Sequence, residues 1–147
     1  MKKIASFSVN HDKLKKGMYV SRIDGDVVTY DLRMKVPNAG DYLSNGALHT
    51  FEHLFATYAR NSALSDSVIY VGPMGCRTGF YVSRLDALHL VQESFAFIRD
   101  FEGEIPGSRR EECGNYKEHD LKGAKETAVD MLEVLKDWTP EKMEYEV

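Results

Sequence analysis

The sequence predicts an α+β fold: an antiparallel sheet packed against helices on one side, in a single domain over residues 1–147. Three observations lead to this prediction. Early segments alternate apolar and polar residues and are joined by a short glycine turn, which indicates a β-hairpin. Later segments repeat apolar residues at three- and four-residue spacing, which indicates amphipathic helices segregated from the hairpin. No repeat or linker divides the chain, and its length suits one compact domain.

The hairpin is predicted from residues 18–36. Apolar side chains at every second position from Val28 to Val36 indicate a half-buried strand that ends at Pro37-Asn38, with Arg33 on its polar face. Residues 18–23 are expected to pair with it, because Gly25 lies in the short turn between the two segments.

Two further strands are expected at residues 67–71 and 78–83, on either side of a glycine-containing loop at 72–76. The segment Ser83-Arg84-Leu85-Asp86 then has the spacing of a helix start. The helix after it is expected to turn four apolar residues inward: Leu88, Val91, Phe95 and Ile98.

Two long helices complete the prediction. The first follows Ser44-Asn45-Gly46 and runs from about residue 47 to residue 61, since its apolar residues repeat every three or four positions. The last spans residues 121–138. Between them, a turn is expected at residues 103–107, and Cys113-Gly114-Asn115 is typical of the end of a short helix closed by glycine.

Composition excludes several classes of protein. The net charge is −4, from 19 basic and 23 acidic residues, which argues against a nucleic-acid or anionic-membrane partner. No apolar run approaches the ~20 residues that span a bilayer, and the serine-broken N-terminus is expected to be mature protein rather than a signal peptide. In a cytoplasmic protein, the cysteines Cys76 and Cys113 are more typical of metal binding or catalysis than of a disulfide.

The segment His49-Thr50-Phe51-Glu52-His53 predicts a divalent metal site. Histidines four positions apart lie on one helix face, close enough to bind one ion, and Glu52 lies near the same edge as a candidate base. The pattern is the inverted form of the His-Glu-x-x-His metalloprotease motif. The alternative is a solvated face with two unrelated histidines. We favour the metal site because two of the five histidines fall in this window beside a glutamate.

Two histidines do not complete such a site, because catalytic sites of this type take about three protein ligands and keep one position open. The simplest assignment places Cys113 on the metal and Cys76 as a reactive group. Cys76 lies in a glycine-flanked loop beside Arg77, which would favour its thiolate. The alternative for Cys76 is a small buried apolar residue. The candidates for the third ligand are Cys113, Cys76, His11, His89 and His119, of which His89 is the most typical of a structural residue.

The chain resembles the S-ribosylhomocysteine lyase (LuxS) family in several separated segments that occur in family order and cover most of the chain. The matching segments are Ser6-Phe7, His11-Asp12, Tyr19-Val20-Ser21-Arg22, Asp31-Leu32-Arg33, Pro37-Asn38, His49-Thr50-Phe51-Glu52-His53-Leu54, residues 72–81, Glu112-Cys113-Gly114-Asn115-Tyr116 and His119-Asp120-Leu121. In the segment Tyr70-Val71-Gly72 the chain departs from some relatives, which carry an aspartate and a serine there.

The resemblance implies a homodimer with its active sites at the interface and one divalent metal per subunit, ferrous iron first, with zinc or cobalt able to occupy the site. It assigns three groups of residues: His49, His53 and Cys113 to the metal, Glu52 and Cys76 to acid–base catalysis, and Ser6, His11 and Arg33 to substrate binding, some from the other subunit.

The reaction implied is cleavage of S-ribosylhomocysteine to homocysteine and 4,5-dihydroxy-2,3-pentanedione, the precursor of autoinducer-2. Moving the sugar carbonyl along the ribose places sulfur β to a ketone, after which elimination becomes feasible; a Lewis acid and bases on either side of the ligand would serve both stages. Two alternatives stay open from the residues alone. One is a metallopeptidase with an inverted His-x-x-Glu-His motif, and the other is a non-catalytic metal-binding module.

Overall fold

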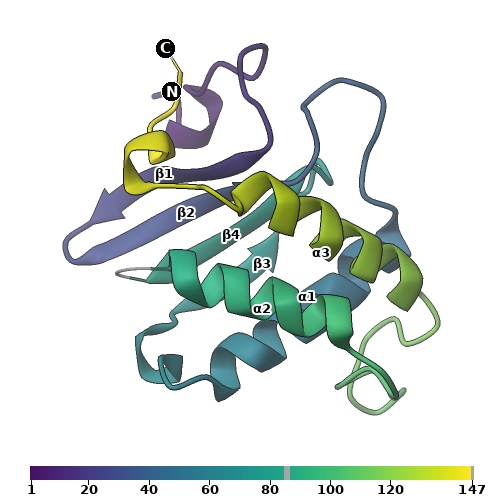
Figure 1. Cartoon of the computed structure of the whole chain (residues 1–147). Helices are drawn as coiled ribbons and strands as arrows, with labels where there is room; N and C mark the ends of the chain where they lie inside the picture. Colours follow the sequence, from purple (N-terminus) through teal and green to yellow (C-terminus); the bar gives the residue numbers. More distant parts are fainter. Residues whose placement is uncertain (85–86, 147) are drawn as a thin grey trace.

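The computed structural model describes residues 1–84 and 87–146, and within them it has a four-stranded antiparallel sheet and three α-helices (Figure 1). The strand order is β1-β2-β4-β3. The strands are β1 (Gly17–Asp24), β2 (Val27–Arg33), β3 (Tyr70–Pro73) and β4 (Gly79–Arg84). The helices are α1 (Asn45–Asn61), α2 (Leu88–Asp100) and α3 (Leu121–Leu135), with short 3-10 helices η1 (Ala5–Phe7), η2 (Ser65–Ser67) and η3 (Pro140–Met143).

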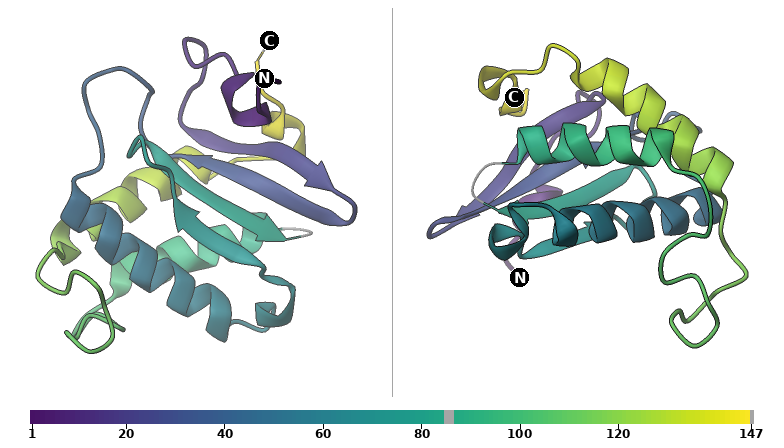
Figure 2. Two further views of the ribbon diagram at one scale, coloured as in Figure 1. Left: turned by 180° about the vertical axis from the view of Figure 1, so that it is seen from behind. Right: turned by 60° about the horizontal axis from the view of Figure 1, so that its bottom comes forward.

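The helices pack against one another on one side of the sheet, with α1 in contact with β3 and α3 in contact with β1 (Figure 2). The predicted α+β class is therefore confirmed. None of the helices in the described part of the chain is long and apolar enough to cross a membrane.

The β1–β2 hairpin is confirmed, but β2 ends at Arg33 rather than at Pro37-Asn38. The backbone N–H groups of Met34 and Lys35 both donate to the carbonyl of Thr78, at 2.8 and 3.0 Å. Two successive N–H groups on one carbonyl break the alternating pattern of an antiparallel ladder, so the strand stops there.

The second pair of strands is also present, with shifted boundaries. β3 begins at Tyr70, because residues 65–67 form the 3-10 helix η2, and it includes Gly72 and Pro73, which we expected in the loop. Ser83 is not a helix start: it lies in β4, paired with Tyr70. The rest of the predicted start, Leu85-Asp86, lies outside the described residues, and α2 begins at Leu88.

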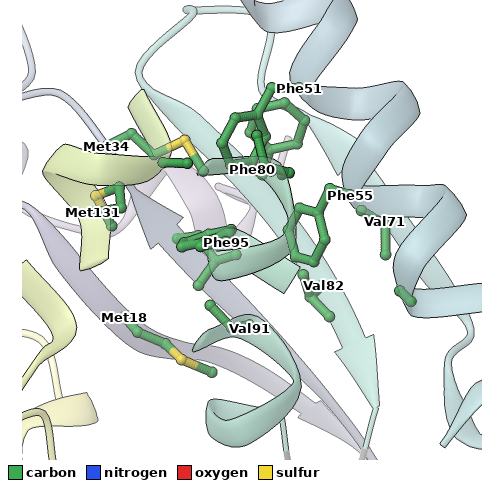
Figure 3. Close-up of a cluster of buried hydrophobic side chains, with 14 of the residues drawn as sticks. Met18, Met34, Phe51, Phe55, Val71, Phe80, Val82, Val91, Phe95 and Met131 are labelled. Atoms are coloured by element: carbon green, nitrogen blue, oxygen red, sulfur yellow. The ribbon is translucent and has the colours of Figure 1, made fainter. Parts of the chain in front are cut away.

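Helix α1 is confirmed, and it begins at Asn45, two residues before the predicted start near residue 47. The Ser44 hydroxyl accepts a hydrogen bond from the backbone N–H of Ala47 at 3.1 Å, which caps an otherwise unpaired donor of the first turn. Its inner face joins the core through aromatic side chains (Figure 3). The Phe95 ring of α2 lies 5.2 Å from that of Phe51 and 5.3 Å from that of Phe55.

The segment between α2 and α3 holds no helix, so the predicted helix end at Cys113-Gly114-Asn115 is wrong. Turns occupy most of residues 103–117. The segment is attached to α1 through two backbone carbonyls: that of Pro106 faces His53, and that of Glu118 faces His49. These contacts with α1, rather than a local helix, hold the segment in place.

Helix α3 begins at Leu121 as expected, with the Asp120 carboxylate accepting from the N–H of Gly123 at 2.9 Å, and it ends at Leu135 instead of Trp138. The Trp138 indole N–H donates to the carbonyl of Met18 at 2.8 Å, which ties the chain after the helix to β1.

Candidate metal centre and active site

Four side chains with metal-binding atoms converge beside the first half of α1: His49, His53, Cys113 and His119. One ligand atom from each lies within 4.8 Å of the others. His49 Nε2 lies 3.3 Å from Cys113 Sγ. The structure therefore brings together the three residues that the sequence assigned to the metal, although Cys113 follows His53 by sixty positions along the chain.

The two α1 histidines are oriented by backbone carbonyls. His49 Nδ1 lies 2.8 Å from the carbonyl oxygen of Glu118, and His53 Nδ1 lies 2.8 Å from that of Pro106. A carbonyl only accepts, so each Nδ1 carries the proton and each Nε2 keeps its lone pair for a metal. Bonds of about 2.0 Å to nitrogen and 2.3 Å to sulfur set tetrahedral ligands roughly 3–4 Å apart. Two imidazoles and a thiolate at this spacing fit a divalent metal.

His119 is the fourth member of the cluster. Its ring stacks on that of His49, with centroids 4.0 Å apart and planes 20° apart. Its Nδ1 lies 3.0 Å from the hydroxyl of Thr50, and its Nε2 lies 4.0 Å from Cys113 Sγ. Burial, and then the neighbouring His49 and His53, hold the pKa of His119 below its usual value.

Glu52 stands on α1 between the two ligand histidines in sequence, and it is half-buried. The helix spacing places it near the edge of the cluster, because residues three apart are neighbours on a helix surface. Glu52 therefore lies on the helix that carries both histidines, where the sequence predicted a candidate base.

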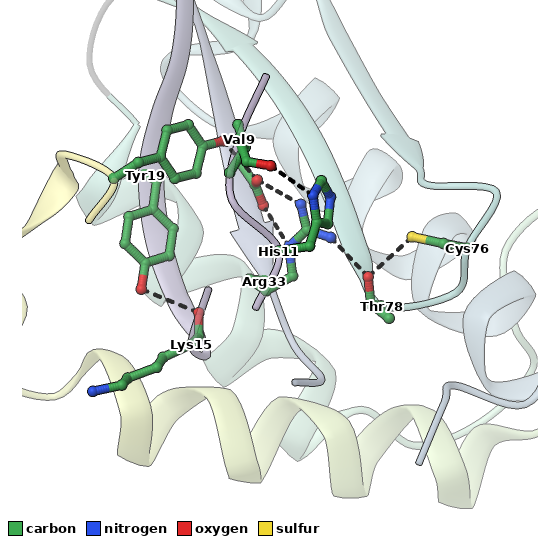
Figure 4. A network of polar contacts seen from close by, with 9 residues as sticks. Val9, His11, Lys15, Tyr19, Arg33, Cys76 and Thr78 are labelled. Atoms are coloured by element: carbon green, nitrogen blue, oxygen red, sulfur yellow. Dashed lines mark hydrogen bonds and ion pairs between the residues drawn. The ribbon is translucent and has the colours of Figure 1, made fainter. Parts of the chain in front are cut away.

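Cys76, in the turn between β3 and β4, belongs to a second polar cluster with Thr78 and Arg33 (Figure 4). Its Sγ lies 3.0 Å from the Thr78 hydroxyl, which accepts a hydrogen bond from Arg33 Nη1 at 2.8 Å. Cys76 is exposed, so the alternative of a small buried apolar residue is wrong. Because the oxygen of Thr78 accepts from Arg33, its hydroxyl hydrogen is free to be donated to the sulfur.

Arg33 is buried, although its place on the polar face of β2 suggested an exposed side chain. Its side chain is 3% exposed, and the guanidinium makes two hydrogen bonds to Asp31, at 3.1 and 2.6 Å. The outer face is covered at this point by Tyr145 from the C-terminal segment, whose hydroxyl donates to Asp31 at 2.6 Å. Burial opposes the charge of Arg33, but the hydrogen bonds and the charge of Asp31 raise its pKa on balance.

Tyr145 is expected to contribute to stability through Asp31. Replacing it by phenylalanine (Tyr145→Phe) removes one donor from a carboxylate that is 1% exposed, and we expect the free energy of unfolding to fall by about 1–3 kcal/mol. Urea denaturation measures this change. Tyr42→Phe, on an exposed tyrosine, is the control, and an equal loss in both variants would contradict the assignment.

Ser6 and His11 lie in the N-terminal segment. Ser6 is half-buried in η1 and borders a depression of about 310 Å³ on the outer side of the sheet, whose lining includes Thr29 and Tyr81. His11 is half-buried, with Nδ1 2.9 Å from the carbonyl of Val9 (Figure 4). Within one chain, the described contacts of Ser6 and His11 connect neither residue to the metal cluster or to Cys76.

Among the described residues, no hydrogen bond or ring contact joins the Cys76 cluster to the metal cluster. In Figure 1 the segment 101–120, which carries Cys113, lies at the lower right beside the start of α1, whereas the β3–β4 turn lies higher, at the end of the sheet. A backbone hydrogen bond nevertheless connects the β3–β4 turn to the segment just before α1: the N–H of Leu43 donates to the carbonyl of Arg77 at 2.9 Å. Arg77 is one of two non-glycine residues in the described part with a left-handed backbone, at φ 61°.

The departure at Tyr70-Val71-Gly72 has a structural counterpart. Tyr70 and Gly72 point to the same face of β3, and a side chain at position 72 would overlap the Tyr70 ring. The tyrosine thus occupies the space above the glycine, so the two differences from some relatives go together.

Sequence reasoning missed three residues of the second cluster: Asp31, Thr78 and Tyr145. The pair Asp31 and Arg33 could have been recognised, since residues two apart on a strand share a face. No local pattern indicated that Tyr145 belongs to this cluster, because its partner Asp31 lies 114 positions away in the sequence.

Comparison with known proteins shows a match to the family model described as S-Ribosylhomocysteinase (LuxS), over residues 4–142. An S-ribosylhomocysteine lyase of Phocaeicola vulgatus is 48% identical, with 99% of this chain and 98% of that protein covered. One of Porphyromonas gingivalis is 50% identical, with 99% of each covered. One of Desulfotalea psychrophila is 49% identical, with 87% of each covered. The chain belongs to the S-ribosylhomocysteinase (LuxS) family.

Proposed function

We propose that this chain is a carbon–sulfur lyase that cleaves S-ribosylhomocysteine to homocysteine and 4,5-dihydroxy-2,3-pentanedione. The observation that carries the proposal is the convergence of His49, His53 and Cys113 from two distant segments, in a chain whose full-length relatives are named for this activity. The family match supports neither of the alternatives, the metallopeptidase and the non-catalytic metal-binding module.

The metal would be held by His49 Nε2, His53 Nε2 and Cys113 Sγ, one ion per subunit. When bound, a divalent ion in this site supplies Lewis acidity toward the sugar oxygens. Mixed imidazole and thiolate ligands suit ferrous iron, cobalt and zinc alike. We propose ferrous iron as the first choice, with zinc and cobalt as substitutes.

Cys76 and Glu52 are proposed to move the protons. They come from a turn and a helix, so they can lie on two sides of one bound sugar. Cys76 Sγ would take a proton from one sugar carbon and return it to the next during the shifts of the carbonyl. Glu52 would carry out the remaining transfers, including removal of the proton that precedes loss of the sulfur.

Arg33 was expected to contact the substrate, and its surroundings support an additional role. All three of its described hydrogen bonds go to Asp31 and Thr78. We propose that the guanidinium fixes the Thr78 hydroxyl, which orients Cys76 Sγ, and that any contact of Arg33 with the substrate is made from this fixed position.

We propose a homodimer with active sites at the interface on the basis of the family match. Ser6 and His11 would then contribute to substrate binding from the other subunit, as the exposed N-terminal segment allows. The proposed location is the cytoplasm, where the product would serve either as a signal precursor or in homocysteine recycling, without a nucleic-acid or membrane partner.

Release of thiol from S-ribosylhomocysteine tests the proposed function. Metal-loaded protein should release homocysteine, detected with a thiol reagent after the protein is removed, and Cys76→Ala should lower the rate at least 1,000-fold while retaining its metal. Ser67→Ala, in the exposed 3-10 helix η2, is the control. Absence of thiol from the intact protein would refute the lyase activity, and full activity of Cys76→Ala would refute the role of Cys76.

A further inference from the structure

His119 has a place in the metal cluster that the proposed function does not use. Its Nε2 lies within reach of the other ligand atoms, so the cluster offers four candidate ligands to one ion. Four protein ligands make a closed structural site, whereas a catalytic site keeps one position open. Whether His119 binds the metal therefore decides whether the centre can bind a substrate.

The hydrogen bonds of Thr50 indicate which nitrogen of His119 carries a proton. Thr50 is fully buried on α1, and its hydroxyl oxygen lies 2.9 Å from the backbone N–H of Asp120 and 3.0 Å from His119 Nδ1. A backbone N–H only donates, so the oxygen accepts from Asp120. The oxygen has a second lone pair, but in the described part of the chain His119 Nδ1 is the one acceptor within reach of the buried hydroxyl hydrogen, so the hydrogen bond that satisfies this hydrogen goes to His119 Nδ1.

This arrangement gives His119 the opposite tautomer from the two α1 histidines. His49 and His53 face carbonyl oxygens, so their Nδ1 atoms carry the proton and their Nε2 atoms are free to bind a metal. His119 faces a hydroxyl donor, so its neutral ring carries the proton on Nε2. That N–H points to Cys113 Sγ at 4.0 Å, within the range of a hydrogen bond to sulfur.

We propose that Thr50 holds His119 as an N–H donor to the Cys113 sulfur, which keeps His119 off the metal and leaves one coordination position open for a substrate oxygen. His119 is thus a positioning residue and Thr50 the group that fixes its tautomer. The inference rests on the proposed function only in naming a substrate oxygen as the occupant of the open position.

Cobalt(II)-loaded protein without substrate tests this directly, with azide as the probe of the open position. The parent protein should bind azide, seen as a change in the cobalt d–d absorption. His119→Ala should keep four-coordinate d–d bands, shift the sulfur-to-cobalt charge-transfer band to longer wavelength because the thiolate loses a donor, and weaken cobalt binding about 10–100-fold. A parent protein that does not respond to azide, or a charge-transfer band that His119→Ala leaves unmoved, would overturn the proposal.

The same azide measurement on variants of Thr50 is the second test. Thr50→Val keeps the shape of the side chain but removes the donor, so the His119 Nε2 lone pair becomes available to the cobalt, and the azide response should fall at least 10-fold. Thr50→Ser retains a hydroxyl and should behave as the parent, as should Thr57→Val two turns further along α1. Identical spectra for Thr50→Val and the parent would refute the role of Thr50. Because these measurements need no turnover, they stand apart from the test of lyase activity.

Discussion

Cys113→Ala is expected to lose its bound metal, from about one ion per chain to near zero. His49 and His53 would remain of the three proposed ligands, and we propose that His119, the fourth member of the cluster, is held in a tautomer that does not bind. A site of this kind needs about three protein ligands, so we expect the affinity to fall well beyond 100-fold and thiol release to disappear with the metal. Metal analysis after gel filtration measures the loss.

The two cysteines form a matched pair for this experiment. Cys76→Ala should retain metal at the parent stoichiometry, because Cys76 belongs to the other cluster, with Thr78 and Arg33. Cys113→Ala protein that keeps its metal would show that the ligand assignment is wrong. Loss of metal from both variants would point to unfolding, which circular dichroism detects.

Asp31→Ala is expected to lower the free energy of unfolding by about 3–5 kcal/mol. Asp31 and Arg33 are 1% and 3% exposed, and the change leaves the Arg33 guanidinium buried without its carboxylate. Removing one partner of a buried ion pair costs far more than the pair itself contributes, because the remaining charge cannot be solvated. Guanidinium chloride denaturation measures the change, and thiol release should fall as well, since Arg33 would no longer fix Thr78.

The same hairpin supplies the control. Asp24 accepts two hydrogen bonds from Arg22, at 2.7 and 2.5 Å, with the same two-residue spacing, but both side chains are more than half exposed. Exposed pairs contribute little, so Asp24→Ala should leave stability almost unchanged. Equal losses in the two variants would contradict the claim that burial makes the Asp31–Arg33 pair important.

The elements that the sequence predicted correctly are those whose pattern is local. Helix α1 carries both its cap at Ser44 and its apolar period within one segment, and the β1–β2 hairpin has alternation and a glycine turn. The predicted helix end at Cys113 failed because a glycine after a cysteine resembles a cap, whereas the segment is held by carbonyl contacts to His49 and His53 that no local pattern encodes.

The site shows the same division. Histidines four apart on a helix, with a cysteine in a separate motif, were enough to predict three of the four candidate ligands that the structure brings together. Burial of Arg33 was not predictable from the alternation in β2, because distant segments pack on the same face, among them the C-terminal segment whose Tyr145 donates to Asp31. The proposed exclusion of His119 from the metal depends on one hydroxyl hydrogen of Thr50, and residue spacing carries no information about the 3.0 Å contact between the two side chains.

Titration of metal-free protein with cobalt(II) or ferrous iron in the presence of S-ribosylhomocysteine tests the central claim most directly. The rate of homocysteine release should rise in proportion to bound metal and level off at about one ion per chain, with the five-carbon dione formed in equal amount. Full release by metal-free protein, or no release at full loading, would contradict the account of this chain as a metal-dependent S-ribosylhomocysteine lyase.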